Sequence, residues 1–163
     1  MANYHLRRAD RAIDDPAELD RILSTTKHVS VALCGPDLVP HVVVMSHGYD
    51  AERNCLYFHA AKAGRKMDLL RANPRVAAIA VEDLGYKAGE CSHGYRSVHL
   101  SGMLAEVADP VEAMHALEVM IRRLEPDPEA VLAKFLDEFR QGRPLPCAIL
   151  RLSIEERTGK HGS

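Results

Sequence analysis

Short apolar runs rich in β-branched residues alternate with turn signals along this chain and predict about six β-strands. The first two runs are separated by Gly35-Pro36-Asp37, which is typical of a hairpin turn. The run at 95–107 is interrupted at Gly102, where a glycine inside a strand indicates a bulge or bend. A polar, glycine-containing segment before it, 82–92, predicts a loop. The predicted strands are 29–33, 39–45, 55–60, 76–81, 95–107 and 147–154.

Four other segments carry apolar residues at helical spacing. Asp15-Pro16 and Asp109-Pro110 each place a capping carboxylate before a proline, which favours a helix start. A third helix, 64–73, should end at Asn73-Pro74, because a residue before proline avoids the helical conformation. A fourth is predicted at 129–139.

The order of these elements favours a mainly β fold with added helices. The strands follow one another as hairpins instead of in regular βαβ alternation, which indicates a six-stranded antiparallel barrel and not a Rossmann sheet. No G-x-G-x-x-G follows a strand, and no phosphate-binding P-loop motif occurs. We expect one domain over residues 1–163, with a helical insert at about 110–140.

Composition narrows the class of protein further. A net charge of -2 over 163 residues gives no reason to expect a nucleic-acid partner. No long apolar run predicts a membrane span, and residues 1–16 lack the apolar core of a secretory signal. The four cysteines are scattered without a CxxC pair, which predicts reduced thiols, no zinc site and a cytoplasmic location.

The segment at 57–66, YFHAAKAGRK, is the most informative for chemistry. A strand ends in small residues and leads into a helix that starts with Arg65 and Lys66. Unpaired backbone N–H groups and the helix dipole favour an anion such as a phosphate at this position, and the two cations would add charge-assisted hydrogen bonds. The alternative is a basic turn in contact with solvent.

These residues also carry a resemblance. Val42-Val43-Val44, then the segments 57–66, 73–76 (NPRV) and 95–98 (YRSV), occur in the order seen in the pyridoxamine 5'-phosphate oxidase-like FMN-binding split-barrel family. The opening segment 7–11 (RRADR) and the closing segment 158–160 (TGK) resemble the nitroimidazole-resistance branch of that family. The resemblance covers roughly residues 5 to 160.

The resemblance implies a split-barrel homodimer that binds FMN between its subunits. Strand residues would line the flavin, Arg65 and Lys66 would hold its phosphate with Lys62 close by, and Ser97 would contact it, with Arg96 preceding. The implied cofactor-binding residues are His41, Val42, Val43, Val44, Met45, His59, Ala60, Lys62, Arg65, Lys66, Arg96 and Ser97.

Some features depart from the pattern of the true oxidases. Their flavin strand starts with an arginine, where this chain has His41, and their substrate-binding Tyr, Arg and Ser and their C-terminal Trp have no counterpart here. The resemblance therefore implies FMN binding more strongly than vitamin B6 oxidation. It leaves the catalytic residues unknown.

The expected function is that of an FMN-dependent oxidoreductase acting on a small molecule, with nitro-group reduction as one reaction and a reduced nicotinamide as the electron donor. The alternative is a non-catalytic carrier or sensor of flavin or haem. Of the nine histidines, His41 and His59 are candidates for flavin contact or proton transfer. Cys91 beside His93 is a second candidate reactive site.

Overall fold

The protein forms one strongly curved antiparallel sheet with helices at its ends. The computed structural model describes residues 8–162. The strands follow the order β3-β2-β6-β7-β8-β5-β4, and β1 pairs with β8 outside this path. Their bounds are β1 Ala12–Ile13, β2 His28–Cys34, β3 Pro40–Ser46, β4 Gly48–Asp50, β5 Cys55–Ala60, β6 Arg75–Lys87, β7 Ser92–Glu106 and β8 Ala148–Gly162.

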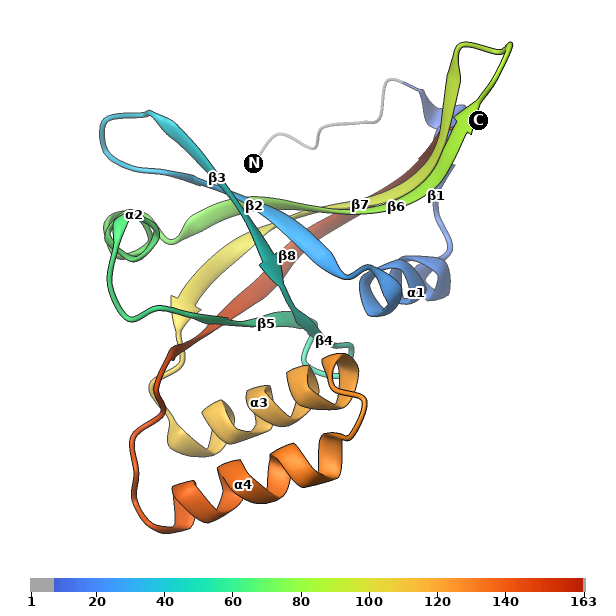
Figure 1. Cartoon of the computed structure of the whole chain (residues 1–163). Coiled ribbons are helices and arrows are strands. Elements are labelled where there is room, and N and C mark those ends of the chain that lie inside the picture. The colour runs from blue at the N-terminus through green and yellow to red at the C-terminus, as the bar shows by residue number, and fades with distance from the viewer. Residues whose placement is uncertain (1–7, 163) are drawn as a thin grey trace.

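The helices begin within one residue of their predicted positions. They are α1 Pro16–Thr25, α2 Arg65–Ala72, α3 Pro110–Leu124 and α4 Pro128–Arg140, and a 3-10 turn, Ala9–Arg11, precedes β1. The side chains of Asp15 and Asp109 accept hydrogen bonds from Ala17 N and Val111 N, so both capping predictions are confirmed. In Figure 1, α1 and α2 lie at opposite ends of the curved sheet, and α3 and α4 lie side by side below β5.

The inward side chains of the sheet form the main core. On β2, the inward residues Val29, Val31 and Leu33 are all buried, while the residues between them are half-buried. The apolar stripe of α1 packs into the same cluster and covers one end of it. Because β3 also approaches β5, the sheet curls towards closure as a split β-barrel. The predicted fold class is therefore confirmed, with eight strands in place of six.

The helices α3 and α4 pack a second apolar cluster against β5 and β8. Cys55, Tyr57 and Ile149 on the strands contact Leu117 and Met120 on α3. Polar groups fix the arrangement, because the hydroxyl of Tyr57 donates to Glu112 at 3.1 Å and Arg151 donates to the same carboxylate at 2.9 Å. The predicted helical insert is thus docked on the sheet by both apolar and charged contacts.

The prediction of a loop at 82–92 is wrong. In the structure β6 and β7 continue as an antiparallel hairpin as far as Lys87 and Ser92, and it projects from the barrel in Figure 1. The side chains of this part of β6 are mostly exposed, so the sequence lacks the alternation of polar and apolar residues by which strands are recognised. Two short strands, β1 and β4, were missed for lack of length, and β8 continues eight residues beyond the predicted end at 154.

Two glycine-containing motifs have a structural explanation. The register of β7 against β8 shifts between Ser101 and Gly102, so the predicted bulge is confirmed. Gly159, in the closing TGK segment, pairs with Ile13 of β1, and a Cβ at Gly159 would lie 2.3 Å from the Leu19 side chain. A larger residue would separate β8 from β1 and α1. Arg7, in the opening RRADR segment, lies outside the described residues.

Candidate functional site

The strand β3 presents an apolar edge to solvent. It pairs along its whole length with β2 and lies at the end of the sheet, so half of its backbone polar groups point away from the ladder. Val42 and Val44 are 60% and 66% exposed, while Met45 is buried and His41 and Val43 are half-buried. Such a strand edge can bind a flat aromatic ring, because the valine side chains can contact the ring and the free backbone groups can form hydrogen bonds with its polar atoms.

The exposed valines belong to a larger uncharged face of the sheet. The strand registers place Val44, Ser30, Ile79, His99 and Thr158 in one row across β3, β2, β6, β7 and β8. A parallel row contains one charged residue, Glu156. Its members are Val42, Ala32, Ala77, Ser101 and Glu156. Such depletion of charge is typical of the core of a protein interface.

The connection from β5 to α2 carries the predicted phosphate-binding residues. The cap residue Gly64 provides no side chain, so the first N–H groups of α2 have no side-chain acceptor. Within residues 8–162, Lys62, Arg65 and Lys66 have no carboxylate partner within 4.0 Å. Lys66 is half-buried, and this burial lowers the pKa of its ammonium group. A partly buried cation without a counter-ion, beside an uncapped helix start, fits an anionic group.

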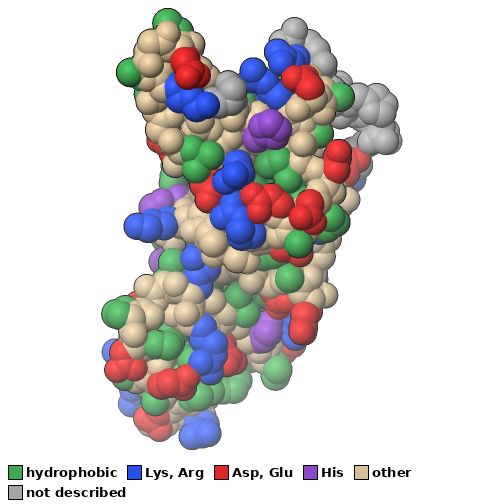
Figure 2. All heavy atoms as spheres, turned by 90° about the vertical axis from the view of Figure 1, so that its right-hand side faces the viewer, with side chains coloured by type: hydrophobic (Ala, Val, Ile, Leu, Met, Phe, Trp, Pro, Cys, Tyr) green, Lys and Arg blue, Asp and Glu red, His purple; other side chains and the backbone are tan. Residues whose placement is uncertain are grey.

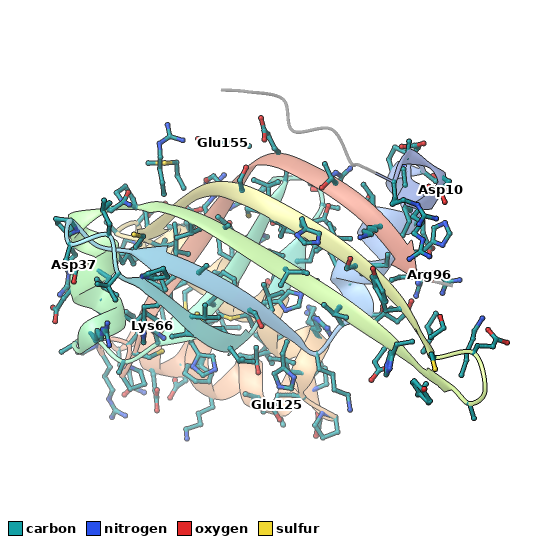
Figure 3. The ribbon with its side chains drawn as sticks, turned by 90° about the horizontal axis from the view of Figure 1, so that it is seen from above. Asp10, Asp37, Lys66, Arg96, Glu125 and Glu155 are labelled. Carbon is teal, nitrogen blue, oxygen red and sulfur yellow. The ribbon has the colours of Figure 1, made fainter. Side chains whose placement is uncertain are left out.

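The position of α2 is fixed against the β2–β3 hairpin. The Asn73 side chain donates to the carbonyl of Cys34 at 2.8 Å, and Gly35 lies against the side chain of Leu69. At the other end of the connection, Arg71 donates to the carbonyl of Lys62 at 3.2 Å. Figure 3 shows Lys66 at the same end of the molecule as Asp37 in the hairpin turn. These contacts hold α2 against the turn between β2 and β3.

Other predicted site residues fall in two places. His59 is exposed at the end of β5, and Ala60 beside it is buried, so both lie where the chain leaves the barrel for α2. Arg96 and Ser97 are on β7, three strand spacings from β3, or ~14 Å at about 4.8 Å each. Ser97 is buried and its hydroxyl donates to the Lys160 carbonyl at 3.4 Å.

Arg96 belongs to a network of ion pairs on the α1 side of the molecule. Its guanidinium lies 3.3 Å from Glu18 and 3.2 Å from Glu82, and Arg21 pairs with the same two carboxylates at 2.7 Å. Figure 2 faces this side and shows acidic and basic side chains intermingled across it. Arg96 and Ser97 therefore lie apart from the predicted site residues on β3.

Two of the described histidines, His47 and His93, have hydrogen-bond partners of their own. The structure places His47 in the core, where its Nε2 donates to the Leu23 carbonyl at 2.8 Å. His93 lies 2.7 Å from Asp83, so its hydrogen-bond partner is that carboxylate and not the Cys91 thiol, which is exposed at the hairpin turn. Among the residues that the structure describes, no group of three or more His, Cys, Asp or Glu side chains is placed to hold a metal ion.

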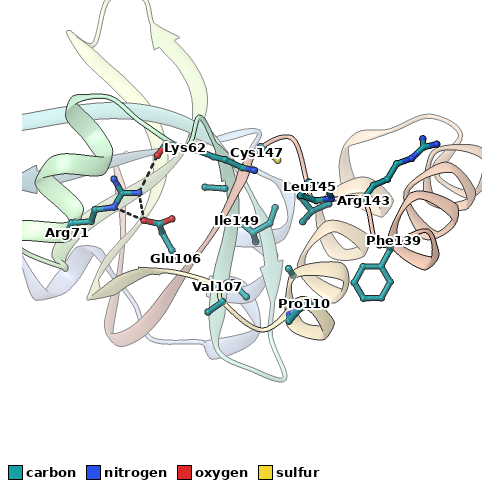
Figure 4. Close-up of a pocket in the computed structure, with 15 residues that line it drawn as sticks. Lys62, Arg71, Glu106, Val107, Pro110, Phe139, Arg143, Leu145, Cys147 and Ile149 are labelled. Atoms are coloured by element: carbon teal, nitrogen blue, oxygen red, sulfur yellow. Dashed lines mark hydrogen bonds and ion pairs between the residues drawn. The ribbon is translucent and has the colours of Figure 1, made fainter.

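A groove that the sequence did not predict lies between the helical insert and the start of β8. It has a volume of about 630 Å³ and is bounded by Lys62 and Arg71 on one side and by Phe139 and Leu145 on the other (Figure 4). Its lining residues come from four stretches of the chain, at 62, 71, 106–113 and 139–149, the last of which includes the connection between α4 and β8. No local motif marks such a site, because the fold alone brings these segments together.

The curved sheet, its exposed edge strand and the basic helix start define a split-barrel protein with a candidate anion site. The model of the family described as pyridoxamine 5'-phosphate oxidase matches residues 15–161, and the chain belongs to this family. A search of curated proteins found no significant match. Within residues 8–162, no helix is both long and apolar enough to cross a membrane.

Solved structures share the fold. A candidate 5-nitroimidazole antibiotic resistance protein from Bacteroides thetaiotaomicron is 24% identical with a TM-score of 0.70, over 93% of this chain and 86% of that one. A FAD-binding protein from Mesorhizobium loti is 25% identical with a TM-score of 0.62, over 94% and 96% of the two chains. A FAD and heme binding protein from Mycobacterium smegmatis is 21% identical with a TM-score of 0.72, over 94% and 74%.

Proposed function

We propose that this protein binds FMN and acts as an FMN-dependent oxidoreductase on a small molecule. The observation that carries the proposal is the pair Arg65 and Lys66, which have no carboxylate partner within residues 8–162 and stand at an uncapped helix start, at the end of the molecule that holds the β2–β3 turn (Figure 3). They would hold the phosphate. Val42 and Val44 would contact the flavin ring, and backbone groups of β3 would bind its polar edge.

FMN in particular is favoured over a larger dinucleotide by this arrangement. A single terminal phosphate needs one cluster of cations, and the described residues at the β3 end supply one such cluster. The similarity to flavin-binding proteins supports a flavin in general, since the relatives from Mesorhizobium loti and Mycobacterium smegmatis bind FAD. When bound, FMN would supply the transfer of electrons between a donor and an acceptor.

The protein is proposed to work as a homodimer through the uncharged face of β3, β2, β6 and β7. Two copies of this face would shield Val42 and Val44 from water and exclude water from the flavin. Arg96 and Ser97 lie ~14 Å across the sheet from β3, so a contact of either residue with the flavin would have to be with a flavin held on the partner's β3.

The reaction proposed is reduction of a small acceptor, with nitro compounds as the first class to test and a reduced nicotinamide as donor. The relative from Bacteroides thetaiotaomicron supports this choice of acceptor. We assign proton exchange with the flavin to His41 on β3 and His59 near the end of β5, because imidazole groups can both donate and accept protons. The four cysteines of the chain are unpaired thiols, which fits the reducing cytoplasm as the proposed location.

The absorbance spectrum of the purified protein tests this function. Flavin bands that survive desalting after FMN is added, and that bleach anaerobically with NADH or NADPH, are expected. Flavin bands that no nicotinamide bleaches would favour a carrier over an enzyme. A Soret band in place of flavin bands would identify a haem protein, and a colourless protein that ignores FMN would overturn the proposal.

A further inference from the structure

The groove beside the helical insert has the size and composition of a small-molecule site. Its volume of about 630 Å³ is within the range of ligand pockets. The walls are mainly apolar and come from the entry to α3, the end of α4 and the start of β8. The apolar lining residues include Val107, Pro110, Phe139, Pro144, Leu145 and Ile149. Phe139 is 37% exposed, so part of this apolar surface faces the open groove.

The charges around the groove are unbalanced. Glu106 is the one acidic residue in its lining, and it is neutralised by Arg71 at 2.8 Å. Lys62 and Arg143 also line the groove and have no carboxylate partner within residues 8–162. In Figure 4 the side chain of Lys62 extends along the groove towards Cys147. The net excess of positive charge therefore lies next to an apolar wall.

We propose that this groove binds a small organic anion with an apolar body, such as an aromatic carboxylate or sulfonate. The acidic group would pair with Lys62, and the ring would lie against Phe139, Leu145 and Ile149. Charge complementarity favours an anionic ligand. Among the described lining residues, a cationic ligand would meet a single carboxylate, that of Glu106, which is already paired with Arg71. An organic anion should bind more tightly than a small inorganic anion, because the inorganic anion would leave the apolar wall in contact with water.

The groove is separate from the proposed flavin position. Of the twelve residues that the resemblance implies for the flavin, Lys62 is the one that lines the groove. Its side chain extends along the groove in Figure 4, so we assign Lys62 to the groove and leave the flavin phosphate to Arg65 and Lys66. Arg65 and Lys66 are at the start of α2, whereas the groove contacts α2 through Arg71 near its end. The inference therefore stands whether or not FMN binds at β3.

The direct test is a fluorescence titration of the FMN-free and FMN-saturated protein with 8-anilinonaphthalene-1-sulfonate. Saturable binding is expected, and FMN should leave it unchanged. Lys62→Met should weaken it roughly 10-fold by removing a charge-assisted hydrogen bond. Ala108→Trp, at an exposed position in the lining, should block the groove and abolish binding. Lys134→Met, an exposed position on α4 outside the groove, is the matched control and should bind as the unaltered chain does.

A second readout locates the probe without relying on the variants. Cys147 lines the groove and is half-buried, whereas Cys91 is exposed at the distant β6–β7 hairpin turn. The probe should slow alkylation of Cys147 by iodoacetamide several-fold, followed for each peptide by mass spectrometry, and leave Cys91 unaffected. Unsaturable binding, equal slowing of both cysteines, displacement of the probe by FMN, or equal weakening in Lys134→Met would each overturn the proposal.

Discussion

The carboxylate of Asp50 lies 2.6 Å from Nε2 of His115 and so links β4 to the middle of α3. Asp50 is 8% exposed, and its other oxygen accepts the backbone N–H of Arg53 at 3.0 Å. Burial alone would raise the pKa of Asp50, but the hydrogen bonds from His115 and Arg53 outweigh it and hold the pKa below 3.8. The ionised carboxylate thus anchors the helical insert to the barrel.

A double-mutant cycle measures this anchor. Asp50→Ala, His115→Ala and the double variant should give a coupling energy of about 1 kcal/mol in urea unfolding, because a partly buried hydrogen bond to a charged group contributes on that order. The exposed pair Glu118 and Arg122 on α3 serves as the control and should give less than about 0.5 kcal/mol. Equal coupling in the two pairs would contradict the anchoring role of Asp50.

The buried His47 should make stability depend on pH. Burial lowers its pKa to about 4, with the Leu23 carbonyl opposing this shift and the charge of Arg123 adding to it. The neutral ring is therefore favoured in the folded protein. Its Nδ1 is buried without a partner among the described residues, which leaves no acceptor to stabilise a second proton.

The direction of the effect follows from the two protonation states. Because the folded pKa lies below the ordinary 6.5, the contribution of His47 is complete above pH 6.5 and is lost as pH falls towards about 4. The free energy of unfolding should fall by up to about 1.4 kcal/mol per pH unit in that window. His47→Leu should flatten this part of the curve, and His161→Ala, an exposed histidine, should not. An unchanged slope in His47→Leu would show that other groups control acid unfolding.

The bulge at Gly102 should tolerate no side chain. A Cβ there would lie 2.0 Å from the Ser153 carbonyl oxygen, which is backbone in the neighbouring β8 and cannot turn aside. Gly102→Ala should therefore cost on the order of 2–4 kcal/mol, as overpacking against backbone does. Ser101→Ala, at the adjacent half-buried position, should change the free energy of unfolding by no more than about 0.5 kcal/mol. Comparable losses in both variants would indicate a general sensitivity of β7 instead.

The proposed dimer should depend on the exposed valines of β3. Val42→Lys with Val44→Lys places two charges on the uncharged face and should convert the dimer to a monomer in sedimentation velocity experiments. The control is Leu136→Lys on α4, which is 41% exposed but lies outside that face. A monomeric unaltered protein at tens of micromolar, or dissociation by Leu136→Lys as well, would contradict the assigned interface.

The sequence predicts the helices and the buried strands well because their signals are local. The side chains of Asp15 and Asp109 each accept a hydrogen bond from the backbone N–H two residues later in the chain. The strand that contains Val29 and Val31 has a buried residue at every second position, which is the period of a β-strand. The outer part of the β6–β7 hairpin was missed because pairing there depends on the partner strand and not on an apolar pattern.

The candidate site also combines local features, which the sequence predicts, with features that only the fold creates. The strand-to-helix segment containing Arg65 and Lys66 is contiguous, so the sequence alone is enough to propose it as an anion site. The distance of Arg96 from β3 and its pairing with Glu18 and Glu82 depend on strand order, which the sequence does not specify. The groove near Lys62 also requires the folded chain, because its walls come from segments more than eighty residues apart.

The central claim, that Arg65 and Lys66 hold the phosphate of FMN, is tested most directly by comparing FMN with riboflavin, which lacks the phosphate. The dissociation constants of both ligands should be measured by flavin fluorescence quenching for the unaltered protein, for Arg65→Ala with Lys66→Ala, and for Lys134→Ala with Arg140→Ala as the control. Two charge-assisted hydrogen bonds should make FMN bind about 100-fold more tightly than riboflavin. That preference should vanish in the Arg65 and Lys66 variant and persist in the control. Equal affinity of the unaltered protein for FMN and riboflavin would contradict the account.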